Sequence, residues 1–305
     1  MNDFLSTVPF DLYELSLFHL VVKHRSFTKA AEAAGITQSA ITRQMQGVED
    51  RLGINLLERT TRSVRVTTAG EFLYRESGRL LGDVDQSLRR LKEEYANAPK
   101  EVRIGVSRSI SMAHLPGFFH ANVRQQQQVA YHVSYQSSPE ILSAIENNEM
   151  DLGVLCPPKH FSKAVSVTHR FNDSFTIIAP TAKAEAFHLL PKSKNSRIDW
   201  LKAQDWLLLE DGTNTGKELR RWMSRTGLKV EPSMQLDSFD LIINLVSLGM
   251  GVSLVPVRAL ALYGRKSTLS RLAWKERFTR EIVVVMRRHR KQPPHLAQFV
   301  RNILF

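Results

Sequence analysis

The chain has 305 residues, a formal net charge of +12, and 43% hydrophobic and 24% charged residues. This length predicts two or three domains with sizeable cores, and the ordinary soluble composition excludes a disulfide-stapled mini-protein, a collagen-like repeat and a disordered chain. The single cysteine, Cys156, excludes an intramolecular disulfide, a two-thiol redox switch and a Cys-based zinc site, and we interpret it as a small buried hydrophobic residue.

No segment of the sequence predicts a membrane span or an export signal. The longest apolar-rich stretch, residues 241–257, is interrupted by Gly, Ser and Asn and is shorter than the ~20 apolar residues of a membrane span. The first residues lack the basic region and the small-residue cleavage site of a signal peptide. We therefore expect a cytoplasmic protein without membrane association.

The positive charge is confined to one part of the chain. Residues 1–99 contain 13 Lys or Arg and 13 Asp or Glu, whereas residues 100–305 contain 29 against 17 and carry the whole +12. A charge of this size favours an anionic partner, with nucleic acid as the first candidate. Its distribution does not locate a DNA site.

The first 66 residues have the apolar spacing of three short helices. One helical face of the first consists of Leu15, Phe18 and Val22. Ser26 can cap a second helix over residues 28–34, which Gly35 ends. A third helix is predicted from about Thr37 to Leu52. Its buried face would be Ile41, Met45, Val48 and Leu52, and its polar face Gln38, Ser39, Thr42, Arg43 and Gln46.

The second and third predicted helices are spaced as a helix-turn-helix. Ala31 allows close helix approach, Gly35 makes the turn four residues later, and Ile41 anchors the following helix. These three positions alone also fit an ordinary pair of antiparallel helices. The wider sequence decides in favour of the helix-turn-helix.

The wider sequence resembles the N-terminal DNA-binding domain of LysR-type transcriptional regulators. The resemblance rests on FTKAAEAAGITQSAITRQ at residues 27–44, then VE at 48–49, LG at 52–53, LLERT at 56–60 and VTTAG at 66–70. It implies an all-α winged helix-turn-helix over residues 1–67 with the wing at 63–66. A linker helix over 68–97 and an effector-binding α/β domain over 98–305 would follow.

The predicted DNA contacts lie on the third helix and around the wing. The first turns of a recognition helix face base edges in the major groove, whereas arginines beside a wing contact phosphates. The predicted recognition-helix contacts are Thr37, Gln38, Ser39, Thr42, Arg43 and Gln46, and the predicted wing contacts are Arg59, Arg62 and Arg65.

The linker helix carries a pairing pattern. Thr68 and Glu71 predict a capping box at its start. Apolar residues then recur about every 3.5 positions, as in a coiled coil: Ser77, Leu81, Val84, Leu88, Leu91 and Tyr95. Packing of this stripe against its own winged domain is the alternative. Pairing predicts a homodimer or homotetramer on an operator with an inverted repeat.

After residue 98, short apolar strands alternate with helices, which predicts a mainly parallel, doubly wound sheet. The predicted strands are 101–107, 129–135, 151–156, 175–179, 206–209, 234–236, 252–256 and 282–286, and the predicted helices are 114–124, 139–147, 216–225, 239–248 and 295–304. The resemblance implies two subdomains similar to periplasmic binding proteins. Subdomain I would span about 100–178 and 280–305, and subdomain II about 179–279.

Hydroxyl-rich segments at three strand ends predict an effector site. Ligands of open α/β sheets bind beyond the carboxyl ends of strands, where helix N-termini offer N–H donors. The predicted residues are Ser107, Arg108, Ser109, Ser137, Ser138, Gly212, Thr213 and Asn214. Together with the positive charge they favour a small anionic effector. Each Ser or Thr can equally be a helix cap, and Arg108 a surface arginine.

No enzyme signature is present, and we predict no catalytic residue, cofactor or metal site. The sequence lacks HExxH and Gly-x-Ser-x-Gly motifs, and Gly249 to Gly251 ends a helix rather than opening a dinucleotide loop. The basic run 287–291 is interpreted as a solvated turn rather than a nucleic-acid patch. The predicted function is a ligand-responsive transcriptional regulator, with RNA polymerase as a further partner. The rival is a solute-binding or catalytic α/β protein with an added helical module.

Overall fold

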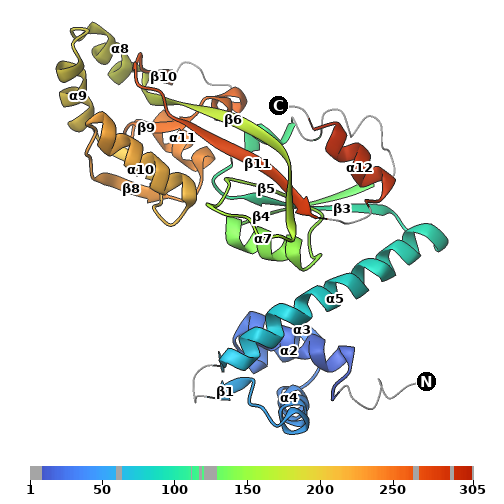
Figure 1. The fold of residues 1–305 in the computed structure, drawn as a ribbon. Coiled ribbons are helices and arrows are strands. Elements are labelled where there is room, and N and C mark those ends of the chain that lie inside the picture. The colour runs from blue at the N-terminus through green and yellow to red at the C-terminus, as the bar shows by residue number, and fades with distance from the viewer. Residues whose placement is uncertain are drawn as a thin grey trace. The chain divides into compact units, whose positions relative to one another are not determined.

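The computed structural model describes residues 9–59, 64–110, 112–116, 119, 129–263, 268–288 and 292–303 (Figure 1). The chain forms two compact units that divide between Ala98 and Pro99. The first unit is helical with a small two-stranded sheet, and the second is α/β.

Three short helices form the body of the first unit, as the sequence predicts. They are α2 (Leu12–His24), α3 (Phe27–Ala34) and α4 (Gln38–Leu52). The hydroxyls of Ser26 and Thr37 accept hydrogen bonds from the backbone N–H groups of Lys29 and Ala40, which fixes the starts of α3 and α4. Gly35 and Gly53 end these helices in the left-handed conformation that glycine adopts without strain.

The core of the first unit lies between the three helices. It contains Phe18 and Val21 from α2, Ala30 and Ala31 from α3, and three of the four residues of the predicted buried face of α4, namely Ile41, Met45 and Val48. The fourth, Leu52, is only half-buried at the end of the helix. Val22, predicted to be buried, is only half-buried, because Leu17 and Val21 are closer to the centre of the bundle.

The wing and the linker helix follow. Strands β1 (Leu57–Arg59) and β2 (Val64–Val66) pair antiparallel, and α5 (Thr68–Tyr95) begins directly afterwards. The predicted capping box of Thr68 and Glu71 is wrong, because the helix is capped one residue earlier and the third residue after that cap is Gly70, which has no side chain to complete a box. Thr67 is the N-cap, because its hydroxyl accepts from the N–H of Gly70 and donates to Leu56 O, which binds the helix start to the wing.

Subdomain I of the second unit is built on one sheet. Its parallel strands are β3 (Lys100–Ser107), β4 (Val129–Gln136) and β5 (Leu152–Leu155). Helix α7 (Ser138–Glu146) packs on one face, and α12 (Pro294–Arg301) packs on the other. A short 3-10 helix, η1 (Met112–His114), follows β3. Most of the predicted helix 114–124, residues 289–291 of the basic run and the end of the last predicted helix lie outside the described residues.

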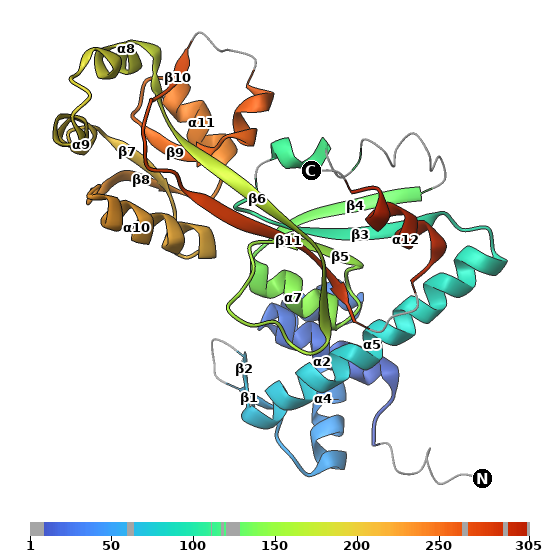
Figure 2. The same ribbon diagram turned by 45° about the horizontal axis from the view of Figure 1, so that its top comes forward.

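Two long antiparallel strands connect the subdomains. They are β6 (Val165–Pro180) and β11 (Thr279–Arg287), which run side by side in Figure 2. Among the described strands the sheet order is β10-β6-β11-β5-β3-β4, with β9 also paired to β6. The sheet is therefore mixed rather than mainly parallel. The predicted strand 175–179 is only the second half of β6, because the first half alternates polar and apolar residues and lacks the continuous apolar run of a buried strand.

Subdomain II has its own large core around Trp206 and Phe239. Strands β7 (Trp206–Leu209) and β8 (Pro232–Leu236) pair in parallel, and β9 (Ser253–Pro256) and β10 (Leu269–Arg271) pair with β6. The helices are α8 (Thr181–Leu189), α9 (Lys194–Lys202), α10 (Asn214–Thr226), α11 (Phe239–Ser247) and the 3-10 helix η2 (Arg258–Leu262). The sequence did not predict α8, α9, β10 or η2.

In the part of the chain that the structure describes, no helix is both long enough and apolar enough to span a bilayer.

Candidate functional site

Helix α4 presents a polar face on a rigid support. Gln38, Ser39, Arg43 and Gln46 are exposed and Thr42 is half-buried, while Ile41, Met45 and Val48 on the opposite face are at most 2% exposed. Thr37 is exposed at the cap, where its hydroxyl also contacts that of Ser39 at 3.1 Å. The predicted recognition-helix residues therefore lie on one surface, and the buried face restricts rotation of the helix beneath them.

The wing is joined to α4 by a residue to which the sequence analysis gave no role. The Glu49 carboxylate accepts hydrogen bonds from the backbone N–H groups of Leu56 and Leu57, at 2.7 and 2.8 Å. Arg65 is exposed on β2, and Arg59 ends β1 opposite Val64. Arg62 and Ser63 lie outside the described residues.

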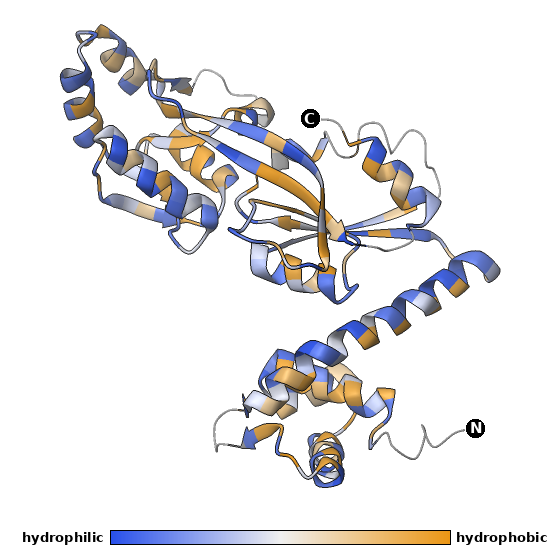
Figure 3. Cartoon of the chain, viewed as in Figure 1, coloured by the Kyte–Doolittle hydropathy of each residue, from blue (hydrophilic) through white to orange (hydrophobic). Residues whose placement is uncertain are grey.

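The stripe on α5 has two parts. Near the start of the helix, Ser77 is buried and its hydroxyl lies 2.8 Å from Nε2 of His19, so this part packs on its own unit. Further along, Leu81 of the predicted stripe is half-buried, whereas its last four members are exposed, namely Val84, Leu88, Leu91 and Tyr95. Leu80 beside the stripe is exposed as well, and Figure 3 shows orange bands recurring along α5. Packing on its own unit therefore holds for the start of the stripe, and pairing stays a prediction for the exposed part.

His19 makes the contact between α2 and α5 sensitive to pH. Its ring stacks on Tyr74 with centroids 4.4 Å apart, and burial lowers the pKa of His19 to about 4. As the pH falls below about 6.5, the unfolded chain binds a proton at His19 and the folded chain does not. The contribution of neutral His19 to the free energy of unfolding is therefore fully present above that pH and is lost between about pH 6.5 and pH 4.

We expect the wild-type chain to be about 2 kcal/mol less stable at pH 5 than at pH 7 through this group. His19→Phe keeps the stacking and removes the titration. Urea unfolding followed by far-UV circular dichroism would measure the difference between wild type and variant at both pH values. If the difference in free energy of unfolding between wild type and variant were the same at pH 5 and pH 7, His19 would not titrate between these pH values.

The predicted effector residues separate into two groups. Ser107, Ser109 and Ser138 come together: the hydroxyls of Ser107 and Ser109 are 3.3 Å apart, and that of Ser138 donates to Ser107 at 3.4 Å. Ser137 and Thr213 instead cap α7 and α10 through the N–H groups of Glu140 and Gly216. The exposed members of the predicted set are Arg108, Ser137, Gly212 and Asn214.

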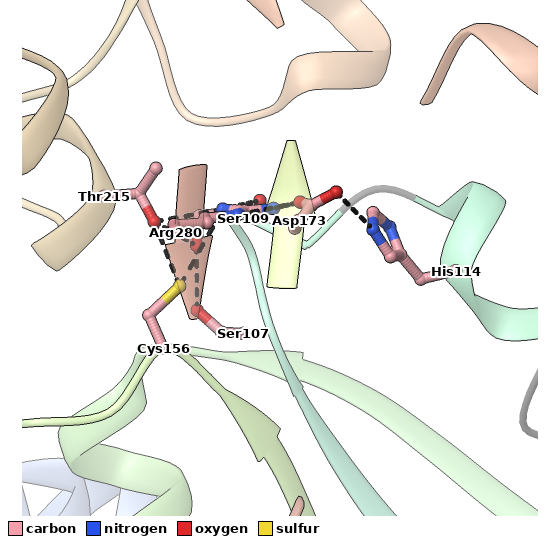
Figure 4. Close-up of polar contacts among 7 residues, drawn as sticks. All are labelled: Ser107, Ser109, His114, Cys156, Asp173, Thr215 and Arg280. Carbon is pink, nitrogen blue, oxygen red and sulfur yellow. Dashed lines mark hydrogen bonds and ion pairs between the residues drawn. The ribbon is translucent and has the colours of Figure 1, made fainter. Parts of the chain in front are cut away.

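A buried polar cluster joins the two subdomains beside these serines (Figure 4). Arg280, on β11, donates from Nη1 to Ser109 O at 2.8 Å and to Thr215 Oγ1 at 3.0 Å, and from Nε to Asp173 Oδ2 at 2.9 Å. The Thr215 hydroxyl donates to Ser109 Oγ at 3.4 Å. Because Ser109 follows β3 and Thr215 lies in α10, the guanidinium of Arg280 connects subdomain I to subdomain II.

The charges in this cluster balance each other. Burial raises the pKa of Asp173, but its contact with Nε2 of His114 at 3.2 Å and the charge of Arg280 outweigh burial and hold that pKa below its usual value. Arg280 also lies over the rings of Phe175 and Phe239, at 5.1 and 5.4 Å. No motif or spacing in the sequence predicts a role for Arg280, Asp173, His114 or Thr215.

Cys156 also lies in this cluster. It is buried as predicted, but it is more than a small hydrophobic residue, because its Sγ is 3.1 Å from Thr215 Oγ1 and accepts from Arg280 Nη1 at 3.8 Å.

A groove of about 440 Å³ along β3 and β4 is lined by Arg103, Ile104, Tyr131, His132, Val133, Ser134, Glu149 and Met150. None of the eight predicted effector residues lines this groove.

Comparison with known proteins identifies both units. Residues 12–71 match the bacterial regulatory helix-turn-helix of the lysR family, and residues 97–304 match the LysR substrate binding domain. The RuBisCO operon transcriptional regulator of Allochromatium vinosum is 25% identical over 302 residues, which is 96% of this chain and 95% of that protein. The regulator BenM of Acinetobacter baylyi is 28% identical over 81% of this chain and 80% of its own length.

Solved structures share the fold. Full-length CbnR, solved in a complex with its target DNA, superposes with a TM-score of 0.66 at 20% identity, covering 96% of this chain and 99% of that one. The relatives named here are transcriptional regulators, which supports regulation over the rival interpretation as an enzyme or solute-binding protein. Since the two matches lie in chain order and the second alone spans more than half of the sequence, the chain belongs to the LysR family of transcriptional regulators.

Proposed function

We propose that the exposed face of α4 reads base edges in the major groove, while Arg59, Arg62 and Arg65 contact phosphates. The observation that carries this proposal is the single polar surface of Gln38, Ser39, Arg43 and Gln46 above a fully buried face. Arginine and glutamine make bidentate contacts with guanine and adenine, so this surface has the chemistry of direct readout. The chain is not an enzyme in this proposal, and it needs no cofactor.

Arg43→Ala is expected to relax sequence preference while the protein stays folded. Arg43 is exposed on α4, so truncation removes a base contact worth roughly 1 to 3 kcal/mol of discrimination and no core packing. Competition binding between preferred and scrambled duplexes measures the preference. Glu32→Ala, an exposed change on α3, is the control. Equal preference in Arg43→Ala and wild type would remove Arg43 from the reading surface.

The exposed part of the α5 stripe supports assembly into a homodimer or homotetramer. Two copies paired along α5 would present two recognition helices, which favours an operator with an inverted repeat. RNA polymerase is a further proposed partner, as expected of a regulator that acts at promoters.

We also propose that a small anion, such as a carboxylate, binds at the junction of the subdomains. The hydroxyls of Ser107, Ser109 and Ser138 gather there at the carboxyl end of β3 and can donate to an acceptor. Ser107 and Ser109 are at most 5% exposed, so a ligand reaches them only when the subdomains separate. Binding would then favour one arrangement of the subdomains, and that preference would change the affinity for DNA.

Calorimetry against carboxylates, phosphates, amines and sugars tests the ligand class. Ser107→Ala is expected to weaken anion binding at least about tenfold, because a lost hydrogen bond to a charged group corresponds to about 1.5 to 3 kcal/mol. Ser162→Ala is the matched control, since Ser162 is exposed, lies outside the predicted effector residues and donates to the carboxylate of Glu146. Binding confined to amines or sugars would contradict an anionic effector, and normal binding by Ser107→Ala would contradict the site.

A further inference from the structure

The positive charge of the second unit, called the effector unit below, is not explained by the residues at the junction of its subdomains. Residues 100–305 carry the whole +12, yet the buried Arg280 faces Asp173 at 2.9 Å. Surface charges act over about 8 to 10 Å at physiological salt, so cations elsewhere add little for a ligand at the junction. The excess positive charge therefore has to be located on the surface.

One helix face holds a row of these cations. Lys217, Arg221 and Arg225 recur every four residues along α10, so they lie on one side of the helix about 6 Å apart along its axis. All three are exposed, and none forms an ion pair with another described residue. Arg220 on the same helix differs, because it pairs with Asp211 at 3.1 Å and donates to Val230 O. We call Lys217, Arg221 and Arg225 the α10 cationic row.

The surroundings of the α10 cationic row are polar. Asn214, Glu218 and Ser224 are its exposed neighbours on the helix, and Glu218 is the sole acidic residue of α10. Leu219 and Met223 are buried on the opposite face, which holds the row in a fixed orientation. Trp222, three positions before Arg225, is half-buried, and its indole N–H donates to Arg277 O. Protein interfaces have an apolar centre and are depleted in lysine. Regularly spaced cations on an otherwise polar surface instead suit a row of phosphates.

We propose that the α10 cationic row binds the phosphate backbone of the DNA that the N-terminal unit holds. The proposal rests on DNA binding by α4 in the proposed function. Once α4 is bound, the second unit is tethered to the duplex, and its effective concentration there is high enough for weak contacts to count. The contacts are independent of sequence, because they involve phosphate oxygens only.

The test is the salt dependence of binding to a random-sequence duplex of about 60 bp, measured by fluorescence anisotropy with the full chain. The variant is Lys217→Gln, Arg221→Gln, Arg225→Gln, whose glutamines keep helix propensity. The control, Lys163→Gln, Lys192→Gln, Lys202→Gln, removes the same charge from exposed lysines outside the row. Circular dichroism verifies that both fold.

Each phosphate contact contributes about 0.9 to the slope of log affinity against log salt, so losing three lowers the slope by about 2.7 for each contacting protomer. When the salt is raised from about 50 to about 200 mM, the wild type would therefore lose about 40 times more affinity than the row variant. The control is expected to keep the wild-type slope.

An unchanged slope in the row variant would overturn the proposal. An equal decrease of the slope in the row variant and in the control would also overturn the proposal, since the unit would then act through its net charge and not through the row. If the row variant kept its DNA slope but lost binding to polyglutamate, the row would serve an acidic protein instead. Arg43→Ala separates the two proposals: relaxed preference in that variant with no slope change in the row variant leaves the proposed function standing.

Discussion

The double substitution Val84→Glu, Leu88→Glu is expected to separate the oligomer into single chains. Both residues are exposed on the apolar part of the α5 stripe, where pairing would bury them. Burying such side chains contributes ~1.5 to 3 kcal/mol each, and a two-fold interface loses both in each copy. The dissociation constant should therefore rise at least about a thousandfold, even before the cost of burying four carboxylates is added.

Size-exclusion chromatography with light scattering measures this dissociation directly. The control is Arg90→Glu, Ala96→Glu, which places two carboxylates at exposed positions of the same segment outside the apolar stripe. The control should elute as wild type. If the Val84→Glu, Leu88→Glu variant also did so, the exposed stripe would not be the pairing surface.

Asp173→Ala should destabilise the effector unit by about 3 to 5 kcal/mol, because it leaves the fully buried guanidinium of Arg280 without a counter-charge. All four tryptophans lie between residues 200 and 274, so their fluorescence during urea unfolding reports this unit. Glu281→Ala is a matched control on the same pair of strands. It removes the exposed ion pair with Arg170, which should cost less than about 1 kcal/mol.

A loss of less than about 1 kcal/mol in Asp173→Ala would contradict the described cluster. Such a result would mean that the Arg280 guanidinium reaches water or another carboxylate in solution. The connection between the subdomains through Arg280 would then need to be abandoned.

Local signals made the first unit predictable. Ser26, Thr37, Gly35 and Gly53 each act on their own helix within a few residues, so the helix ends follow from the sequence. The polar face of α4 follows from helical periodicity in the same way. The start of α5 was misplaced by one residue because Thr67 and Thr68 both have the chemistry of a cap. The two are distinguished by contacts with residues distant in sequence, because the Thr67 hydroxyl donates to the carbonyls of Asn55 and Leu56.

The buried cluster was not predictable because its contacts are distant in sequence. Asp173 and Arg280 are 107 positions apart, and each belongs to a strand whose pairing decides that it is buried. In the sequence, Asp173 lies in a polar stretch that resembles a solvated loop. Ser107, Ser109 and Ser138 could be predicted as a group because they follow the ends of neighbouring strands. The hydroxyls of Ser137 and Thr213 instead accept hydrogen bonds from backbone N–H groups at the starts of their helices.

Selection of binding sites from a random DNA library by the full chain shows whether α4 reads DNA. We expect enrichment of an inverted repeat whose half-sites are about one helical turn apart. We also expect the Arg43→Ala chain to recover a more degenerate repeat with the same spacing. Recovery of no preferred sequence by the wild-type chain would contradict the claim that α4 reads DNA.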